Sequence, residues 1–156
     1  MNDESRRRLN QLLSSQRVLS LSVLIDGLPH IGLLPYALSP DFQGGLVHAS
    51  KLARHSRGLQ RGAPFSLLVH APDQPDSDPL QVPRVTLNGE VRVVDRDAAE
   101  YPTLRDAYLR RLPEAEVTFG LGDFTLYELQ FREGRYVEGF AAAVNVTNED
   151  LRQLAK

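Results

Sequence analysis

Alternation of apolar and polar residues with a period of two is the feature that most constrains this fold. In the run RVTLNGEVRVV, residues 84–94, valine and leucine alternate with Thr, Asn, Glu and Arg. The run RVLSLSVLID, residues 17–26, alternates in the same way and ends at an Asp-Gly pair. Successive side chains of a strand point to opposite faces, so this pattern predicts strands with one buried face each.

Other segments complete a mainly β pattern. Further strands are expected over residues 30–39, 46–49, 65–70, 124–131 and 135–137, with a turn at Glu133-Gly134 between the last two. Helices are expected over residues 3–16, 50–60, 97–111 and 148–155, with Asp3 and Ser50 as caps of the first two. The first three strands have no helices between them, which a parallel sheet would require. We therefore expect one domain, residues 1–156, built as a small antiparallel barrel with peripheral helices.

Composition excludes several classes of function. Lys and Arg total 18 against 20 Asp and Glu, a net charge of −2, so no overall field draws the chain to nucleic acid or an anionic membrane. Cysteine is absent, which excludes disulfides, thiolate metal sites and cysteine nucleophiles. No apolar run approaches the roughly 20 residues of a membrane span. The polar amino terminus is unlike a secretory signal, so we expect a cytoplasmic protein.

Positive charge is concentrated in residues 50–61, which contain no acid. The basic residues of this segment are Lys51, Arg54, Arg57 and Arg61. Hydrogen-bond donors are added by Ser50, His55 and Ser56. A helix that begins here offers unpaired backbone N–H groups as well, a combination that suits phosphate. The residues alone leave open the alternative that this is a solvated basic helix face.

Signals for metal binding and for catalytic side chains are weak. The histidines, at positions 30, 48, 55 and 70, show neither HxxxH nor HExxH spacing, so no metal site is expected. The sequence has no nucleophile elbow, P-loop or dinucleotide-binding glycine motif. Gly120 and Gly122 indicate a loop, and the acids around them are expected to be solvated. We assign no catalytic residue.

The order of several segments resembles a known family. The runs are PHIGLLPYAL, HASKLARHSRGLQRGAPFSLLV, RVTLNGEV, GDFTLYEL and VEGFAAAV. Together, over about residues 5–155, they resemble the FMN-binding split-barrel superfamily, the relatives of pyridoxamine 5′-phosphate oxidase. The segment from Ser50 to Leu59 is most similar to the branch of heme-utilisation and heme-degrading proteins, with a Leu-Ala pair and a His-Ser pair between these residues.

This resemblance implies a six-stranded antiparallel split barrel that forms a homodimer with two flavin sites at the interface. It implies that the strand with Pro35 and Tyr36 lies along the isoalloxazine and that Arg84 lies near the flavin. It assigns the phosphate to Ser50, Lys51, His55 and Ser56, and the basic segment adds Arg57 to this cofactor site. At Gly58 the family often has Asn, and this chain lacks the basic tail of vitamin B6 oxidases.

The resemblance leads to three functional hypotheses. The first is an FMN-binding, flavin-dependent oxidoreductase whose substrate and electron donor the sequence does not identify. The second is a heme-binding or heme-degrading protein that uses the same dimer cleft. The third is a cofactor-free structural or regulatory dimer. Nucleic acid and membranes are not expected as partners.

Overall fold

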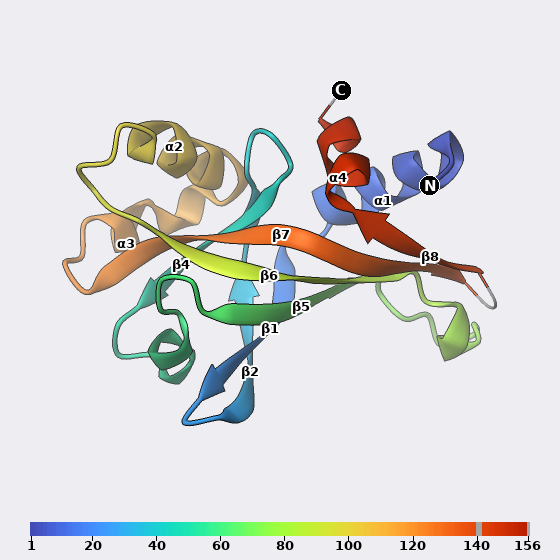
Figure 1. Cartoon of the computed structure of the whole chain (residues 1–156), viewed down its shortest axis with the longest axis horizontal. Helices are drawn as coiled ribbons and strands as arrows, with labels where there is room; N and C mark the ends of the chain where they lie inside the picture. The colour runs from blue at the N-terminus through green and yellow to red at the C-terminus, as the bar shows by residue number, and fades with distance from the viewer. Residues whose placement is uncertain (140–141, 156) are drawn as a thin grey trace.

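A computed structural model describes residues 1–139 and 142–155 (Figure 1). The strands are β1 (Val18–Ile25), β2 (Leu28–Pro35), β3 (Ala37–Leu38), β4 (Gly44–Ser50), β5 (Pro64–His70), β6 (Arg84–Val94), β7 (Phe124–Gly139) and β8 (Ala142–Thr147). The α-helices are α1 (Asp3–Ser15), α2 (Tyr101–Arg111), α3 (Glu116–Phe119) and α4 (Asn148–Leu154). Short 3₁₀ helices are η1 (Arg54–Gly58), η2 (Pro79–Gln81) and η3 (Pro113–Ala115).

The strands form one antiparallel sheet with the order β2-β1-β5-β6-β7-β4-β3, and β8 pairs with β7. The expected mainly β fold with peripheral helices is thus confirmed. The sheet has 8 strands rather than the six implied by resemblance, a minor difference. β2 stands at one end of the order and stops at Pro35, a residue that has no N–H group to donate to a ladder.

One predicted turn is wrong. β7 continues through Glu133 and Gly134 to Gly139, and the return strand is β8. A Cβ atom on Gly134 would lie 2.3 Å from the Thr86 carbonyl oxygen of β6. This glycine therefore permits the close approach of two strands and does not mark a turn.

Two predicted helices begin elsewhere. Ser50 ends β4, residues 51–53 form a turn, and η1, a 3₁₀ helix, follows, so Ser50 does not cap an α-helix. α2 begins at Tyr101 and not at residue 97, because Pro102 fits only the first turn of a helix. The cap of α1 is Asn2, whose side chain accepts a hydrogen bond from the Ser5 amide (2.8 Å). α4 lies where the last helix was predicted.

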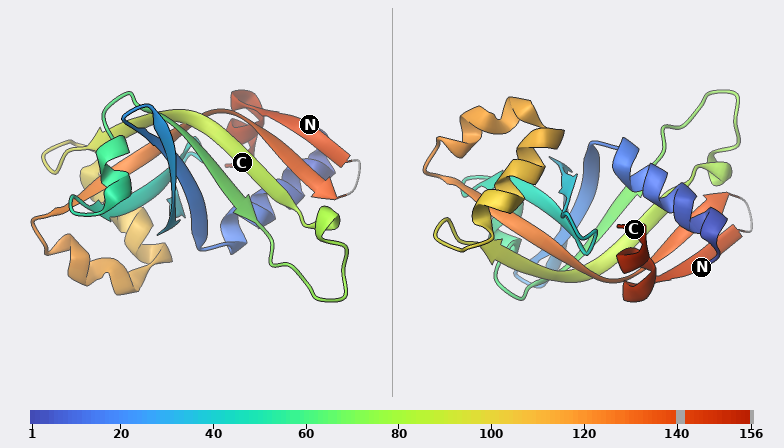
Figure 2. Two further views of the ribbon diagram at one scale, coloured as in Figure 1. Left: turned by 90° about the horizontal axis from the view of Figure 1, so that it is seen from below. Right: turned by 90° about the horizontal axis from the view of Figure 1, so that it is seen from above.

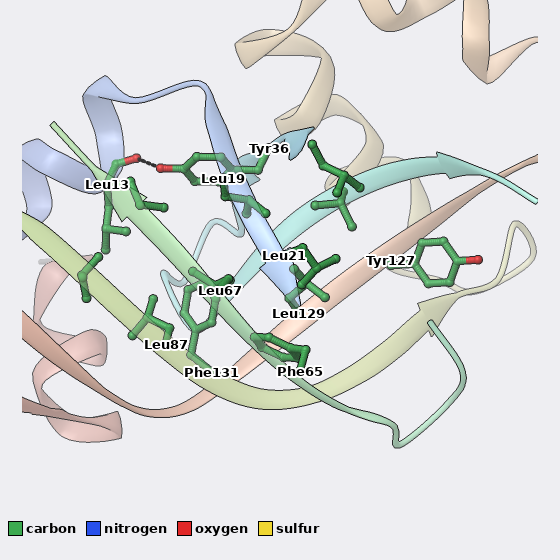
Figure 3. Close-up of a cluster of buried hydrophobic side chains, with 14 of the residues drawn as sticks. Leu13, Leu19, Leu21, Tyr36, Phe65, Leu67, Leu87, Tyr127, Leu129 and Phe131 are labelled. Atoms are coloured by element: carbon green, nitrogen blue, oxygen red, sulfur yellow. Dashed lines mark hydrogen bonds between the residues drawn. The ribbon is translucent and has the colours of Figure 1, made fainter. Parts of the chain in front are cut away.

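The sheet separates two apolar clusters. The larger one is enclosed by the barrel and by α1 and α4, with Leu21, Leu67, Leu87 and Leu129 near its centre (Figure 3). The second lies under α2 and includes Leu104, Tyr108 and Leu126. On β7, Leu126 belongs to the second cluster and Tyr127 to the first, as period-two alternation requires. α2 and α3 cover one end of the sheet, and α1 and α4 the other (Figures 1 and 2).

Candidate functional site

Hydrogen bonds tie the basic segment after β4 to the loop before β7. The Ser50 hydroxyl donates to the Asp123 carboxylate (2.8 Å), and the Lys51 amide donates to the Asp123 carbonyl (2.7 Å). The Ser56 hydroxyl donates to the Ser50 carbonyl (2.6 Å). These bonds place η1 beside the start of β7.

A cavity of about 730 Å³, here called the η1 cavity, lies between η1, the end of β6 and the start of β7. It is lined by Lys51, Ser56, Arg57, Leu59, Gln60, Val93, Val94, Asp95, Arg96, Tyr101, Gly122, Phe124, Thr125, Leu126 and Tyr127. Small-molecule sites have volumes of about 300–1,000 Å³. Three predicted site residues, Lys51, Ser56 and Arg57, therefore meet at one cavity of ligand size.

The lining of the η1 cavity favours anions. Its acid, Asp95, already accepts two hydrogen bonds from Arg61 (2.6 and 2.7 Å). The Lys51 ammonium has no ion pair with the described residues. Arg57 contacts Asp26 at 3.1 Å, but both side chains are exposed, and such pairs contribute little. An anionic group could thus bind Lys51 and Arg57 without breaking a buried ion pair.

The far wall of the cavity was missed by sequence reasoning. It contains Arg96, Tyr101, Phe124 and Tyr127. These residues lie about 40 to 75 positions after the basic segment. Two strand pairings bring them to it: β4 with β7, where Ser50 is opposite Phe124, and β6 with β7, where Val94 is opposite Leu126. No local motif in the sequence marks them.

The hydroxyls of Ser50 and Ser56 make hydrogen bonds within this part of the chain. Ser50 and Ser56 each use their single hydroxyl hydrogen inside the segment, on Asp123 and on the Ser50 carbonyl. The Ser50 oxygen also accepts from the Leu52 amide (3.1 Å). Both side chains thus stabilise the turn, and Lys51 and Arg57 place positive charge at the cavity.

His55 points away from the η1 cavity, towards β2. A Cβ on Gly32 would lie 3.1 Å from the His55 Nδ1 atom. Burial lowers the pKa of His55 from its ordinary value, which favours the neutral ring. η1 therefore presents His55 to β2 and Arg57 to the cavity.

Three other predicted site residues lie outside the cavity. Pro35 is exposed at the end of β2. Tyr36 is buried, and its hydroxyl donates to the Leu13 carbonyl (2.6 Å; Figure 3). Arg84 begins β6, ten residues from Val94 and hence roughly 33 Å from the cavity end of that strand. Its guanidinium donates to backbone carbonyls of the preceding loop.

Gly58 occupies a position where a side chain does not fit. A Cβ atom here would lie 2.6 Å from both Cβ and Cγ2 of Val23 on β1, and 2.9 Å from the Leu24 carbonyl oxygen. η1 packs directly on β1 at this point. Gly58 therefore permits the close approach of η1 to β1 at this position.

A histidine that sequence reasoning left unassigned lies in an aromatic cluster beside the site. The His48 ring stacks on Phe119 at 3.7 Å between centroids and lies 5.1 Å from Phe124. Its Nδ1 atom is 3.0 Å from the Thr118 hydroxyl oxygen. Burial, with a smaller contribution from Arg96, lowers the pKa of His48 to about 4.

Two features are absent from residues 1–139 and 142–155. This part of the chain contains no group of three or more His, Cys, Asp or Glu arranged to hold a metal ion. It also contains no helix long and apolar enough to cross a membrane.

Comparison with known proteins gives relatives over almost the whole chain. Heme oxygenase HutZ of Vibrio cholerae is 24% identical over 147 residues, which cover 92% of this chain and 81% of that protein. A heme binding protein from Mycobacterium smegmatis superposes with a TM-score of 0.84 at 24% identity. That match covers 98% of this chain but 62% of the M. smegmatis chain, so this chain spans about three fifths of its length.

A third similar structure is of a protein whose name does not mention heme. A Clostridium acetobutylicum protein related to general stress protein 26, of the pyridoxinephosphate oxidase family, superposes with a TM-score of 0.70. It is 14% identical, and the match covers 97% of this chain and 99% of that one. The sequence model described as pyridoxamine 5′-phosphate oxidase matches residues 5–138. With most of its length in that match, the chain belongs to the pyridoxamine 5′-phosphate oxidase family.

Proposed function

We propose that this protein binds FMN, with the phosphate at the Lys51 and Arg57 side of the η1 cavity, and acts as a flavin-dependent oxidoreductase. The observation that carries the proposal is a ligand-sized cavity whose basic residues have few internal partners. Membership of the pyridoxamine 5′-phosphate oxidase family supports the choice of flavin over other phosphate esters.

The residues present fit the charge and the aromatic character of a flavin nucleotide. Lys51 and Arg57 would hold the phosphate by charge-assisted hydrogen bonds. Phe124, Tyr101 and Tyr127 supply apolar surface that excludes water. Bound FMN supplies electron transfer, so the protein's part is to anchor and to shield the ring. The proposal therefore assigns no catalytic side chain.

We propose in addition that the protein works as a homodimer through the outer face of β1 and β2. Ile31 and Leu33 of β2 are 78% and 69% exposed, opposite Ser22 and Ser20 of β1. So much exposed apolar surface on one strand is typical of an interface. Arg84 lies on the same face of the sheet, by its register through β5, and would contribute to the flavin site of the other subunit.

Heme is the second candidate, favoured by the names of two relatives, a heme oxygenase and a heme binding protein. Lys51, Arg57 and Arg96 would suit its two propionates. Among the described residues, however, no histidine lines the η1 cavity, and the common axial heme ligands in its lining are Tyr101 and Tyr127. The cavity of a single chain thus fits FMN better than histidine-ligated heme.

A titration with FMN followed by flavin fluorescence tests the proposal. The Lys51→Ala and Arg57→Ala variants should each weaken FMN about three- to tenfold at low salt, and less at high salt, because salt screens exposed charges. Arg105→Ala is the matched control, an exposed arginine of α2 outside the cavity, and should bind as the parent does. If the parent and both cavity variants bind FMN with equal affinity, Lys51 and Arg57 do not hold the phosphate. Tight hemin binding without FMN binding would favour the second candidate.

A further inference from the structure

A second cavity lies beside the later part of α2, and no part of the proposed function uses it. It has a volume of about 340 Å³ and lies between the end of α1, the turn from β3 to β4, and α2. We call it the Phe42 cavity. Its lining consists of Leu13, Ser14, Gln16, Tyr36, Ala37, Leu38, Ser39, Pro40, Phe42, Ala107, Arg110 and Arg111. Apolar side chains form most of this lining.

The charge in this cavity is positive. Arg111 donates to the carbonyls of Ser15 (3.0 Å) and Gln16 (2.9 Å), so it is occupied with the end of α1. The guanidinium of Arg110 makes no hydrogen bond or ion pair with residues 1–139 and 142–155. No carboxylate of the described residues lines the cavity. The nearby Asp41 accepts hydrogen bonds from the Ser39 hydroxyl and the Gln43 amide within its own turn.

Phe42 contributes an aromatic ring to the cavity from a backbone conformation that is energetically unfavourable. Phe42 has a φ of 59°, a left-handed value that is rare for a bulky side chain. Hydrogen bonds fix the turn around it: the Phe42 amide donates to the Ser39 carbonyl (2.9 Å), and the Gly44 amide donates to the Ser39 hydroxyl (2.9 Å). The ring is consequently fixed against the cavity rather than free in solvent.

From this arrangement we infer that the Phe42 cavity binds a small apolar monocarboxylate, an anion with an aliphatic or aromatic body. The body would lie against Phe42, Leu38 and Ala107, and the carboxylate would pair with Arg110 at the rim. The volume is near the lower end of the usual range for ligand sites, which suits a molecule smaller than a nucleotide. This inference goes beyond the flavin proposal and does not depend on it.

Isotope-edited NMR titration with octanoate tests the inference, with 1-octanol and octylammonium as probes of equal chain length. Octanoate should shift the amide signals of α2 and of residues 39–44 and should bind at least about threefold more tightly than octanol. Octylammonium should bind more weakly than octanol, because it meets Arg110 and Arg111. Benzoate in place of octanoate distinguishes an aromatic from an aliphatic body.

Variants separate the two parts of the site. Arg110→Gln should weaken octanoate about three- to tenfold and leave octanol unchanged, and Arg105→Gln on the same helix should change neither. Phe42→Gly keeps the left-handed backbone accessible and removes the ring, so it should weaken both probes. The inference is overturned if octanoate and octanol bind alike, if neither shifts these signals, or if Arg110→Gln binds octanoate as the parent does. FMN affinity of Arg110→Gln should equal that of the parent, which keeps this result separate from the flavin proposal.

Discussion

At the scale of single residues, the protonation state of His48 follows from its neighbours. Thr118 has one hydroxyl hydrogen and donates it to the Ala115 carbonyl (2.8 Å). Its oxygen must therefore accept from His48, which puts the ring hydrogen on Nδ1. A neutral ring stacked on Phe119 fits this cluster, and a charged ring beside Arg96 does not.

This residue should make stability depend on pH. The pKa of His48 is lowered to about 4 in the folded protein, whereas an unfolded chain has an ordinary histidine pKa near 6.5. Between these pH values the unfolded state binds more protons than the folded state. The contribution of His48 to the free energy of unfolding is therefore fully present above pH 6.5 and is lost as the pH falls towards 4. The loss amounts to about 1–3 kcal/mol in the free energy of unfolding.

Urea unfolding at pH 7 and pH 5 measures this difference. His48→Phe keeps an aromatic ring in the stack but cannot take up a proton, so its stability should change less between the two pH values than that of the parent. The same pH dependence in both proteins would show that His48 does not titrate as its surroundings predict.

At the scale of elements, an ion-pair network fastens α2 to the sheet. Arg92 of β6 donates from Nε to the Glu128 carboxylate of β7 (2.8 Å). It also donates from Nη1 to the carboxylate of Glu100, the residue before α2. The Glu128 side chain is 8% exposed. A Cβ on Gly44 would lie 2.8 Å from the Glu128 Cγ atom, so the glycine makes room for this carboxylate.

Removal of one buried partner of this network should be costly. Glu128→Gln leaves Arg92 without its full counter-charge and should lower the free energy of unfolding by about 1–3 kcal/mol. Asp106→Asn, which removes the exposed partner of Arg105 on α2, should cost less than about 0.5 kcal/mol. Denaturant midpoints of the two variants compare the losses in the free energy of unfolding. Equal losses would contradict the view that burial makes the Arg92–Glu128 pair more important than the exposed one.

The elements also show what sequence reasoning can and cannot predict. β6 was predicted with its observed bounds because its alternation is local. The pattern of strands and helices predicted an antiparallel barrel, and the family resemblance added its split form. The turn at Glu133-Gly134 was wrong because a glycine required by a neighbouring strand looks the same in sequence as one required by a turn. The helix over residues 50–60 was wrong because the hydrogen bonds of Ser50 to Asp123 and Ser56 favour a turn.

The candidate site was predictable only in part for the same reason. The basic segment is local, so Lys51 and Arg57 could be found from sequence. Tyr101 and Phe124 reach the cavity through strand pairing, which no local pattern reveals. The orientation of His55 depends on the room left by Gly32, again a contact between segments far apart in the chain.

At the scale of the whole molecule, β7 connects the two apolar clusters. It pairs with β6, β4 and β8 and contributes side chains to both sides of the sheet. The helices cover the ends of the sheet, while the outer face of β1 and β2 is left without a covering helix (Figure 2). This open face is the surface on which we propose the second subunit packs.

A charge placed on this face should prevent dimerisation. Ile31→Glu should convert a dimer to a monomer, because an interface core tolerates no unpaired carboxylate. Leu80→Glu is the matched control, an exposed leucine in the loop before β6, and should leave the mass unchanged. Light scattering coupled to gel filtration gives the masses. A monomeric parent, or a dimer that survives Ile31→Glu, would reject this interface.

The internal use of the Ser50 and Ser56 hydroxyl hydrogens has a consequence for selectivity. An ester phosphate entering beside them meets the diffuse positive potential of long, mobile side chains instead of a rigid array of directed groups. Such recognition depends on the number of negative charges on the ligand and only weakly on the ligand's stereochemistry. Other phosphorylated metabolites would then compete at the phosphate end of the cavity, and discrimination in favour of a flavin would fall to Tyr101, Phe124 and Tyr127.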